Sequence, residues 1–352
     1  MNSTVAVSVI VSTRNRAHYL NDCLGSLAVQ EHDQFEVIVV DNGSTDATAE
    51  VVEEWIRKDP RFRMIREGQV GLSRAKNTGI GLARGDLLLF TDDDVMVDRR
   101  WIGVYVRFFT SIKDEPRIVG GKIVPIPDDL ADWPDWVTDS MLDDLGRLDY
   151  QDERPLREAW EYVWGANMAF QAWAVERWGS WDNALGRRGD ERGTFEDTEF
   201  QDRARAAGAA VWFCPGAVVR HRIARRGVTP CRVLMTSFTR GGNEYWQEKA
   251  RSTGGDRPPQ PPKAPGRLAF AGYLANWLLW TALFRLTSAK PAFRRSHSAA
   301  RSAGRTMERL RDGRTSPPVA KAIGRLGFLV RRITLGLAPG SLAEAEEILG
   351  LR

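Results

Sequence analysis

The sequence predicts an α/β protein whose N-terminal part forms a mainly parallel, Rossmann-like sheet. Over the first hundred residues, short β-branched apolar runs alternate with amphipathic stretches, which is the pattern of βαβ units. Each apolar run also ends in a cluster of polar residues. The 352-residue chain is 43% hydrophobic, with 32 Gly, 17 Pro and 3 Cys, so a disordered, collagen-like or disulfide-stapled protein is excluded.

Four strands and three connecting helices account for this first part. The apolar runs predict strands at Ala6–Ser12, Phe35–Asp41, Phe62–Arg66 and Asp86–Thr91. Apolar residues at helical spacing predict helices at Ala17–Gln30, Asp46–Lys58 and Leu72–Ala83. Ligands of an open parallel sheet bind beyond the carboxyl ends of its strands. We therefore expect the polar clusters Thr13–Asn15, Asp41–Gly43 and Asp92–Asp94 to meet at one crevice.

After about Pro125 the regular alternation stops. The stretch from there to Trp181 holds seven of the thirteen tryptophans, which predicts a tightly packed α+β half or a substrate-side elaboration. Beyond it we expect a helix at Asp197–Ala207, ended by Gly208, and a strand at Ala210–Phe213.

The charge is divided unevenly along the chain. Residues 1–266 carry a net charge of −6 and residues 267–352 one of +10, separated by a Pro-rich linker at 257–266. The tail contains a 17-residue apolar run at 268–284 followed by many arginines, which favours an amphipathic helical segment bound to an anionic membrane surface. An ordinary helical subdomain with an apolar core is the alternative. Nucleic acid is not an expected partner, because the tail mixes its charge with apolar residues.

The cysteines and the N-terminus point to one compartment. Three scattered cysteines do not form a disulfide framework or a zinc site, and the chain starts without a basic segment followed by an apolar one. We expect a cytoplasmic protein, placed at the inner face of the cell membrane by its tail.

Three successive carboxylates, Asp92 to Asp94, follow the fourth predicted strand. Burying like charges without a partner is costly, so a divalent cation is the natural neutraliser. Mg²⁺ or Mn²⁺ held by one or two such carboxylates can join a nucleotide diphosphate to a protein. The alternative is an acidic turn that binds nothing.

The motifs together resemble a known family. Asp41 lies in Val39–Asp46, Thr13 and Asn15 end the preceding strand, and Gly71–Gly79 opens a helix with basic residues. With the aspartate triplet, their order and spacing resemble the nucleotide-diphospho-sugar domain of glycosyltransferase family 2, over roughly residues 5–225. The resemblance implies a GT-A fold with an acceptor-side half, a nucleotide-diphospho-sugar donor and a divalent cation.

The resemblance also implies roles for individual residues of the nucleotide site. Thr13 and Asp41 would hold the nucleobase and ribose, with Asn15 beside them. Asp92 would lie against the ribose or Arg74, and Asp93 could share its role or that of Asp94. Asp94 would bind the metal, with His221 as a further ligand or as a structural histidine. Lys76 either faces the nucleotide or is a solvated helix residue, and Arg14 stands where the family often has an aromatic residue.

The second half supplies the reacting groups. Thr194–Phe200 matches the family's Glu-Asp motif at a helix start, where the dipole favours an ionised carboxylate, so Asp197 is the candidate general base and Glu196 its neighbour. First-turn capping carboxylates are the alternative. Trp164–Phe170 resembles the strand that lines the donor sugar: Gly165 would let the ring approach, Asn167 would bind hydroxyls, and Trp164 would offer an apolar face.

The expected organisation and function follow from these motifs. We expect a catalytic domain at 1–256, with a nucleotide-binding half at 1–125 and an acceptor or sugar half at 126–256. The Gln-x-x-Arg-Trp signature of processive synthases is absent. The prediction is a metal-dependent, inverting, non-processive glycosyltransferase acting on an acceptor hydroxyl, with a lipid-linked or cell-envelope glycan as the favoured acceptor. The alternatives are a soluble transferase for a small metabolite or protein, and a catalytically silent sugar-nucleotide-binding protein.

Overall fold

The computed structural model describes residues 6–111, 115–128, 132–158, 161–189 and 195–224, together with Val228, Val233 and Thr236. The predicted linker at 257–266 and basic tail at 267–352 lie outside these residues, and so does Thr194. Within the part that the structure describes, no helix is both long and apolar enough to cross a membrane.

The chain divides into two compact units. Residues up to 129 and Gly146–Ala224 form the first unit, which carries the sheet and the predicted site residues. Leu130–Leu145 belongs to the second unit, in which the structure describes helix α5 (Asp139–Leu142).

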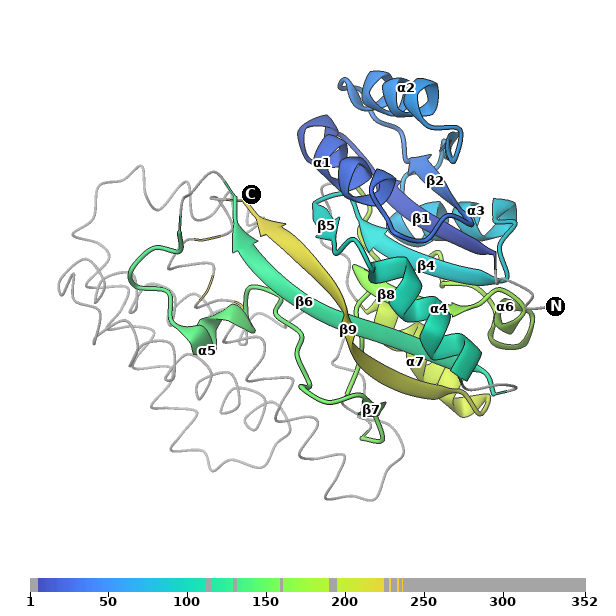
Figure 1. The fold of residues 1–352 in the computed structure, drawn as a ribbon, viewed down its shortest axis with the longest axis vertical. Helices are drawn as coiled ribbons and strands as arrows, with labels where there is room; N and C mark the ends of the chain where they lie inside the picture. Colours follow the sequence, from blue (N-terminus) through green and yellow to red (C-terminus); the bar gives the residue numbers. More distant parts are fainter. Residues whose placement is uncertain are drawn as a thin grey trace, which may run out of the picture. The chain divides into compact units, whose positions relative to one another are not determined.

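The first half of the sheet confirms the predicted parallel arrangement. Its strands lie in the order β3-β2-β1-β4 and are all parallel, with bounds β1 (Val7–Thr13), β2 (Phe35–Asp41), β3 (Phe62–Arg66) and β4 (Leu87–Asp92) (Figure 1). The connecting helices are α1 (Ala17–Ala28), α2 (Thr48–Lys58) and α3 (Leu72–Leu82). The register pairs Thr13 with Asp41 and Ser12 with Asp92, so the predicted polar clusters do meet at one edge.

Beyond β4 the sheet is mixed. Next to β4 come in turn β8 (Asn167–Gln171), β6 (Arg117–Pro127), β9 (Ala210–Ile223) and β5 (Val95–Val97), while β7 (Arg154–Pro155) also pairs with β9. Among these described strands only β6 and β9 pair in parallel, and the other neighbours are antiparallel. The remaining helices of this unit are α4 (Trp101–Ser111), α6 (Ala174–Trp178) and α7 (Glu196–Ala206).

Strand β9 is much longer than the sequence predicts. An end at Phe213 is expected, yet pairing with β6 resumes at Val218 and runs to Ile223. The register shifts between Gly121 and Lys122, where residues 215–217 bulge out of the ladder. His221 therefore lies within a strand and not after one.

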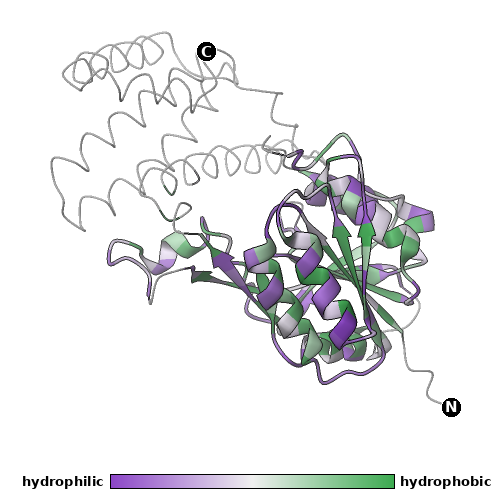
Figure 2. Cartoon of the chain, turned by 90° about the horizontal axis from the view of Figure 1, so that it is seen from above, coloured by the Kyte–Doolittle hydropathy of each residue, from purple (hydrophilic) through white to green (hydrophobic). Residues whose placement is uncertain are grey.

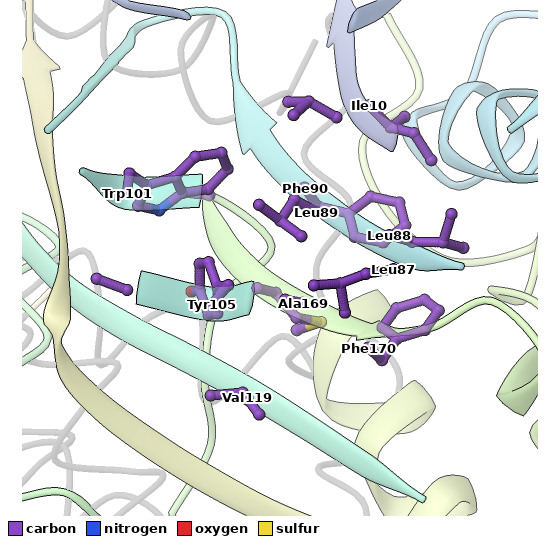
Figure 3. Packing of buried hydrophobic residues seen from close by; sticks show 14 of the residues in the cluster. Ile10, Leu87, Leu88, Leu89, Phe90, Trp101, Tyr105, Val119, Ala169 and Phe170 are labelled. Carbon is purple, nitrogen blue, oxygen red and sulfur yellow. The ribbon is translucent and has the colours of Figure 1, made fainter. Parts of the chain in front are cut away.

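The core is built around β4 and β8. All four apolar residues Leu87–Phe90 are buried, against Phe170 of β8 and against Trp101 and Tyr105 of α4 (Figure 3). Figure 2 shows apolar residues concentrated on the central strands, whereas the helices carry both apolar and polar residues. Burying each large side chain contributes about 1.5–3 kcal/mol, so this layer gives the strand ends a rigid support.

Candidate active site

Asn42 joins three of the loops that form the site edge. Its backbone N–H donates to Thr13 O (2.9 Å), and its side-chain amide donates to Glu67 O (3.3 Å) and Gln69 O (2.9 Å). Its Oδ1 accepts a hydrogen bond from Gly71 N (2.7 Å), next to the start of α3. Sequence reasoning noted Asn42 only as part of a polar cluster, because these contacts come from residues distant in the chain.

Asn15, predicted to bind the nucleotide, ties the loop after β1 to the loop after β2. Its Oδ1 accepts a hydrogen bond from Thr45 N (2.7 Å), and its own N–H donates to Ser44 Oγ (3.0 Å). Its φ of 54° lies in the left-handed region, which asparagine tolerates better than most residues. Asn15 therefore shapes this edge through its backbone as well as its amide.

Asp41 is buried at the end of β2, beside Thr13. Its Oδ1 accepts the Ser44 N–H (2.9 Å), and Arg66 Nε lies 3.5 Å from its Oδ2. Oδ2 accepts no hydrogen bond from the described residues. The structure thus brings Thr13 and Asp41 together, and Arg66 is an ionic partner of the second carboxylate oxygen.

Two members of the aspartate triplet, Asp93 and Asp94, lie beside basic side chains of the chain itself. Arg16 Nη1 lies 3.0 Å from Asp93 Oδ1 and also contacts Asp94 Oδ2, while His221 Nε2 lies 3.4 Å from Asp94 Oδ1. His221 reaches this place because β5 and β9 pair, with Val95 opposite His221. Sequence reasoning missed Arg16, since nothing in its neighbourhood marks it as a partner of residues almost eighty positions away.

The charges of this cluster shift one another's proton affinities. Burial raises the pKa of Asp93, and the charge of Asp94 raises it further. For Asp94, burial acts in the same direction, but His221 and then Arg16 outweigh it and lower the pKa. Burial lowers the pKa of His221, yet Asp94 brings it above its ordinary value.

Asp94 and His221 can also supply part of a metal site. Asp94 Oδ1 is buried and accepts no hydrogen bond from the described residues, and it lies beside an imidazole nitrogen. Oxygen and imidazole donors suit Mg²⁺ or Mn²⁺. No group of three or more His, Cys, Asp or Glu side chains gathers around a metal position in the described ranges. The residues present therefore fit an ion that takes its remaining ligands from water and phosphate.

Asp197, the predicted base, lies at the start of α7 with three hydrogen-bond donors around it. Lys76 Nζ of α3 lies 2.7 Å from its Oδ1, and Trp181 Nε1 lies 3.2 Å from the same atom. The Gly165 N–H donates to Oδ2 at 2.8 Å. Lys76 is buried, with 3% of its surface exposed, so the prediction of a solvated helix residue is wrong.

The two neighbouring carboxylates of the Glu-Asp motif differ in their surroundings. Burial, followed by the charge of Asp197, raises the pKa of Glu196. Burial lowers the pKa of Lys76, but Asp197 and then Glu196 reverse this effect and raise it. The ammonium therefore stays charged, and its hydrogen bond goes to Asp197.

Gly165 has no side chain, and the Lys76–Asp197 ion pair occupies the space that a side chain there would fill. A Cβ atom at this position would lie 2.5 Å from Lys76 Nζ and 2.9 Å from Asp197 Oδ2. The sequence assigns Gly165 to the approach of a sugar, whereas the structure gives it a different task, the close approach of a buried ion pair. Trp164 beside it is 39% exposed and can still contact a ligand.

Asn167 does not have the role that the sequence predicts. Its Oδ1 accepts bonds from Trp101 Nε1 (2.8 Å) and Tyr105 Oη (2.7 Å). Its Nδ2 donates to Lys122 O (3.0 Å) and Ala217 O (2.8 Å). All four hydrogen-bonding positions of the amide are thus used in the core. The predicted bonds to sugar hydroxyls are wrong, because Asn167 instead joins β8 to α4, β6 and β9.

Asp92 is the last residue of β4. Its pKa is raised, first by burial and then by Asp94. The charges of Lys76 and His221 act to lower this pKa, and that of Asp197 acts to raise it. Arg74, the predicted neighbour of Asp92, is half-buried in the first turn of α3, where its charge acts on Glu67.

The chain is similar in sequence to known glycosyltransferases. The model of the family described as "Glycosyl transferase family 2" matches residues 8–160. The putative glycosyltransferase EpsH of Bacillus subtilis is 39% identical over 95 residues, which are 27% of this chain and 28% of EpsH. Glycosyltransferase AglE of Haloferax volcanii is 35% identical over 129 residues, 35% of this chain and 41% of AglE. Each of these relatives is therefore matched over less than half of its length.

A solved structure supports the fold. Residues 1–349 of S. aureus TarS, crystallised in complex with UDP, match with a TM-score of 0.50 and 17% sequence identity, over 88% of this chain and 92% of that one. This likeness agrees with the GT-A arrangement of the sheet. The family match covers residues 8–160, less than half of the chain, so this part of the protein resembles glycosyltransferase family 2 in sequence.

Proposed function

We propose that this protein is a metal-dependent, inverting, non-processive glycosyltransferase that moves a sugar from a nucleotide-diphosphate donor to an acceptor hydroxyl. One observation carries the proposal. Strand β4 leads through Asp92 to Asp94, which lies beside His221 and can hold a metal, and Thr91 of β4 pairs with Asn167 of β8. Two residues before Asn167, the Gly165 N–H holds Asp197, which can act as a base, so two neighbouring strands supply the groups needed at the leaving diphosphate and at the attacking hydroxyl.

The chemistry follows from these positions. The acceptor oxygen attacks the anomeric carbon from the side opposite the diphosphate, its bond to the sugar forms as the sugar–diphosphate bond breaks, and its proton passes to Asp197. A divalent ion held by Asp94 and His221 would supply positive charge to the departing diphosphate. Because the attack and the departure occur on opposite faces, the configuration at the anomeric carbon inverts.

Donor recognition is assigned to the edge formed by β1 and β2. Thr13 and Asp41 would hold the base and ribose, with Asn15 shaping the loop and Arg74 near the nucleotide. A Cβ atom added to Gly189 would lie 2.6 Å from Arg14 Nη1, so the guanidinium packs against that glycine. Arg14 stands at the sequence position where the family often has an aromatic residue. Asp93 completes the acidic edge, and Trp164 offers its exposed face to a sugar.

The direct test is transfer from a panel of UDP- and GDP-sugars, measured with and without EDTA. Asp197→Asn should lower kcat by about 10²- to 10⁴-fold, the usual contribution of a general base. Asp94→Ala should remove the activity that Mn²⁺ restores after EDTA treatment. Full activity of both variants would reject the assignment. Nucleotide binding in thermal-shift assays without turnover of any donor would favour the catalytically silent alternative.

A lipid-linked or cell-envelope acceptor at the inner face of the membrane belongs to the same proposal. It rests on the sequence of residues 267–352, with its +10 net charge and apolar run. Flotation of the full chain with anionic and with neutral vesicles tests it. Binding to the anionic vesicles that weakens at high salt supports the proposal, whereas no binding to either favours a transferase for a soluble acceptor.

A further inference from the structure

We propose that Lys76 is a positioning residue that holds the Asp197 carboxylate by Oδ1, so that Oδ2 receives the proton of the acceptor hydroxyl. The proposal rests on the proposed function, because it assigns a task inside the same reaction. It begins with the contact between Lys76 Nζ and Asp197 Oδ1, at 2.7 Å between helices α3 and α7.

The pair is enclosed by protein. The Lys76 side chain is 4% exposed and that of Asp197 is 14% exposed. Solvent-exposed ion pairs often contribute little, but a buried charge that loses its partner is strongly destabilised. The Lys76 ammonium also lies 4.9 Å from the centre of the Trp181 ring, which favours the same position of the cation.

The two carboxylate oxygens of Asp197 differ in their hydrogen bonds. Oδ1 accepts from Lys76 and from Trp181 Nε1, which use the two positions that a carboxylate oxygen offers. Oδ2 accepts from the Gly165 N–H alone among the described groups. An incoming hydroxyl therefore finds its acceptor position on Oδ2.

The donors on Oδ1 are held by the core. The Trp181 ring stacks on Phe200 with a centroid distance of 4.3 Å and an interplanar angle of 14°, and it packs edge-on against Phe90 at 4.9 Å. The absence of a side chain at Gly165 lets the ammonium come close to the backbone. Asp197 thus cannot rotate to exchange its oxygens without breaking bonds to rigid groups.

Three charged side chains act on Asp197 from the elements packed around it. Glu196 on its own helix and Asp92 at the end of β4 are acidic, and Lys76 on α3 is basic. Glu196 and Asp92 repel the negative charge of Asp197, and Lys76 attracts it. Removing Lys76 takes away the one attractive charge among these three and leaves the hydrogen bonds from Trp181 Nε1 and the Gly165 N–H.

The experiment compares wild type with Lys76→Met by the dependence of kcat/KM on pH, with the UDP- and GDP-sugar panel as donors. The acid limb of the profile should move to higher pH by about one to three units, the usual effect of an opposite charge. At pH 7, kcat should fall at least about tenfold with little change in donor KM. An unmoved acid limb with an unchanged kcat would overturn the proposal.

Lys122→Met is the matched control, since it breaks another lysine–aspartate pair, Lys122 Nζ to Asp149 Oδ2 at 2.7 Å. Its profile should match wild type, and a shift as large as that of Lys76→Met would count against a specific role. If Lys76→Met unfolds, the double variant Lys76→Met/Asp197→Asn decides by its urea midpoint. A midpoint restored toward wild type supports the buried pair, and one that stays low refutes it.

The two proposals fail in different ways. An Asp197→Asn variant with full activity rejects the proposed function and leaves the Lys76 contact without a catalytic meaning. An inactive Asp197→Asn variant together with an unshifted Lys76→Met profile rejects the positioning role alone.

Discussion

The domain neutralises two groups of carboxylates in different ways. At the end of β4, Asp93 and Asp94 contact Arg16, whose side chain is 26% exposed. At the start of α7, Asp197 contacts Lys76, whose side chain is 4% exposed. A partly solvated guanidinium can leave its partners at a lower cost than an enclosed ammonium can. Burial of the cation therefore separates a site that can exchange its counter-charge from one that keeps it.

This difference matches the chemistry that each group is proposed to perform. A metal that arrives with the donor must replace a cation already present, and Arg16 occupies that place beside Asp93 and Asp94. A general base must keep one geometry and one charge through each reaction cycle. Lys76 and the core around Trp181 supply that constancy to Asp197.

The strongest test of the fixed pair is Gly165→Ala. The added Cβ would lie 2.5 Å from Lys76 Nζ, so the ammonium or the carboxylate must move. A displacement of about 1 Å near the reacting atoms can lower kcat about 10²-fold, and we expect a loss of that size. Steady-state kinetics with the donor panel measures it. Ala166→Gly, a change of one methyl group at the next residue, is the control, and equal losses in both would show that the strand and not the pair is sensitive.

Arg16→Met tests whether a metal ion can replace the cation beside Asp93 and Asp94. Losing the charge-assisted bonds to Asp93 and Asp94 should lower the free energy of unfolding by about 1.5–3 kcal/mol in the presence of EDTA. Mn²⁺ should restore more stability to this variant than to wild type, because no guanidinium competes with it. Thermal melts with and without Mn²⁺ measure both effects. Equal Mn²⁺ shifts in the two proteins would contradict the competition.

We expect a smaller loss of stability from a change at Glu36, a carboxylate on β2 that belongs neither to the aspartates at the end of β4 nor to the carboxylates at the start of α7. Burial raises its pKa, but bonds from Arg63 and Ser8 outweigh burial and hold the pKa below the ordinary 4.5. A lowered pKa in the folded state adds stability above pH 4.5, and that stability disappears as pH falls through the folded value. Glu36→Gln should therefore cost about 1 kcal/mol at pH 7 and less at acid pH.

Urea unfolding at several pH values checks this expectation, and transfer activity should stay at the wild-type level. A cost that does not shrink at low pH would show that lost packing, and not the charge, explains the effect. The result gives the scale of an ordinary structural ion pair, against which the Lys76 and Arg16 variants can be judged.

Local patterns made the first half of the fold predictable. Strands β1 to β4 are continuous apolar runs and helices α1 to α3 are amphipathic, so their bounds follow from neighbouring residues to within two positions. The length of β9 did not follow, because Pro215 and Gly216 read as a break whereas the ladder resumes beyond them.

The site was predictable as a set of residues but not as a set of contacts. The sequence motifs alone identify three of the site residues, Asp94, Asp197 and His221. The partners Arg16 and Lys76 depend on which face of a loop or helix is buried, and Lys76 is 121 positions from Asp197. Asn167 was misread for the same reason, since a polar residue in a strand can face a ligand or a core.

The bulge in β9 decides which chemical group stands next to Asp94. Side chains alternate along a strand, so a change of one residue in the length of residues 215–217 would turn every later side chain to the other side. His221 has an arginine on each side, at positions 220 and 222. A single inserted or deleted residue, far from the candidate metal site, would thus replace an imidazole that can bind a metal with a guanidinium that cannot.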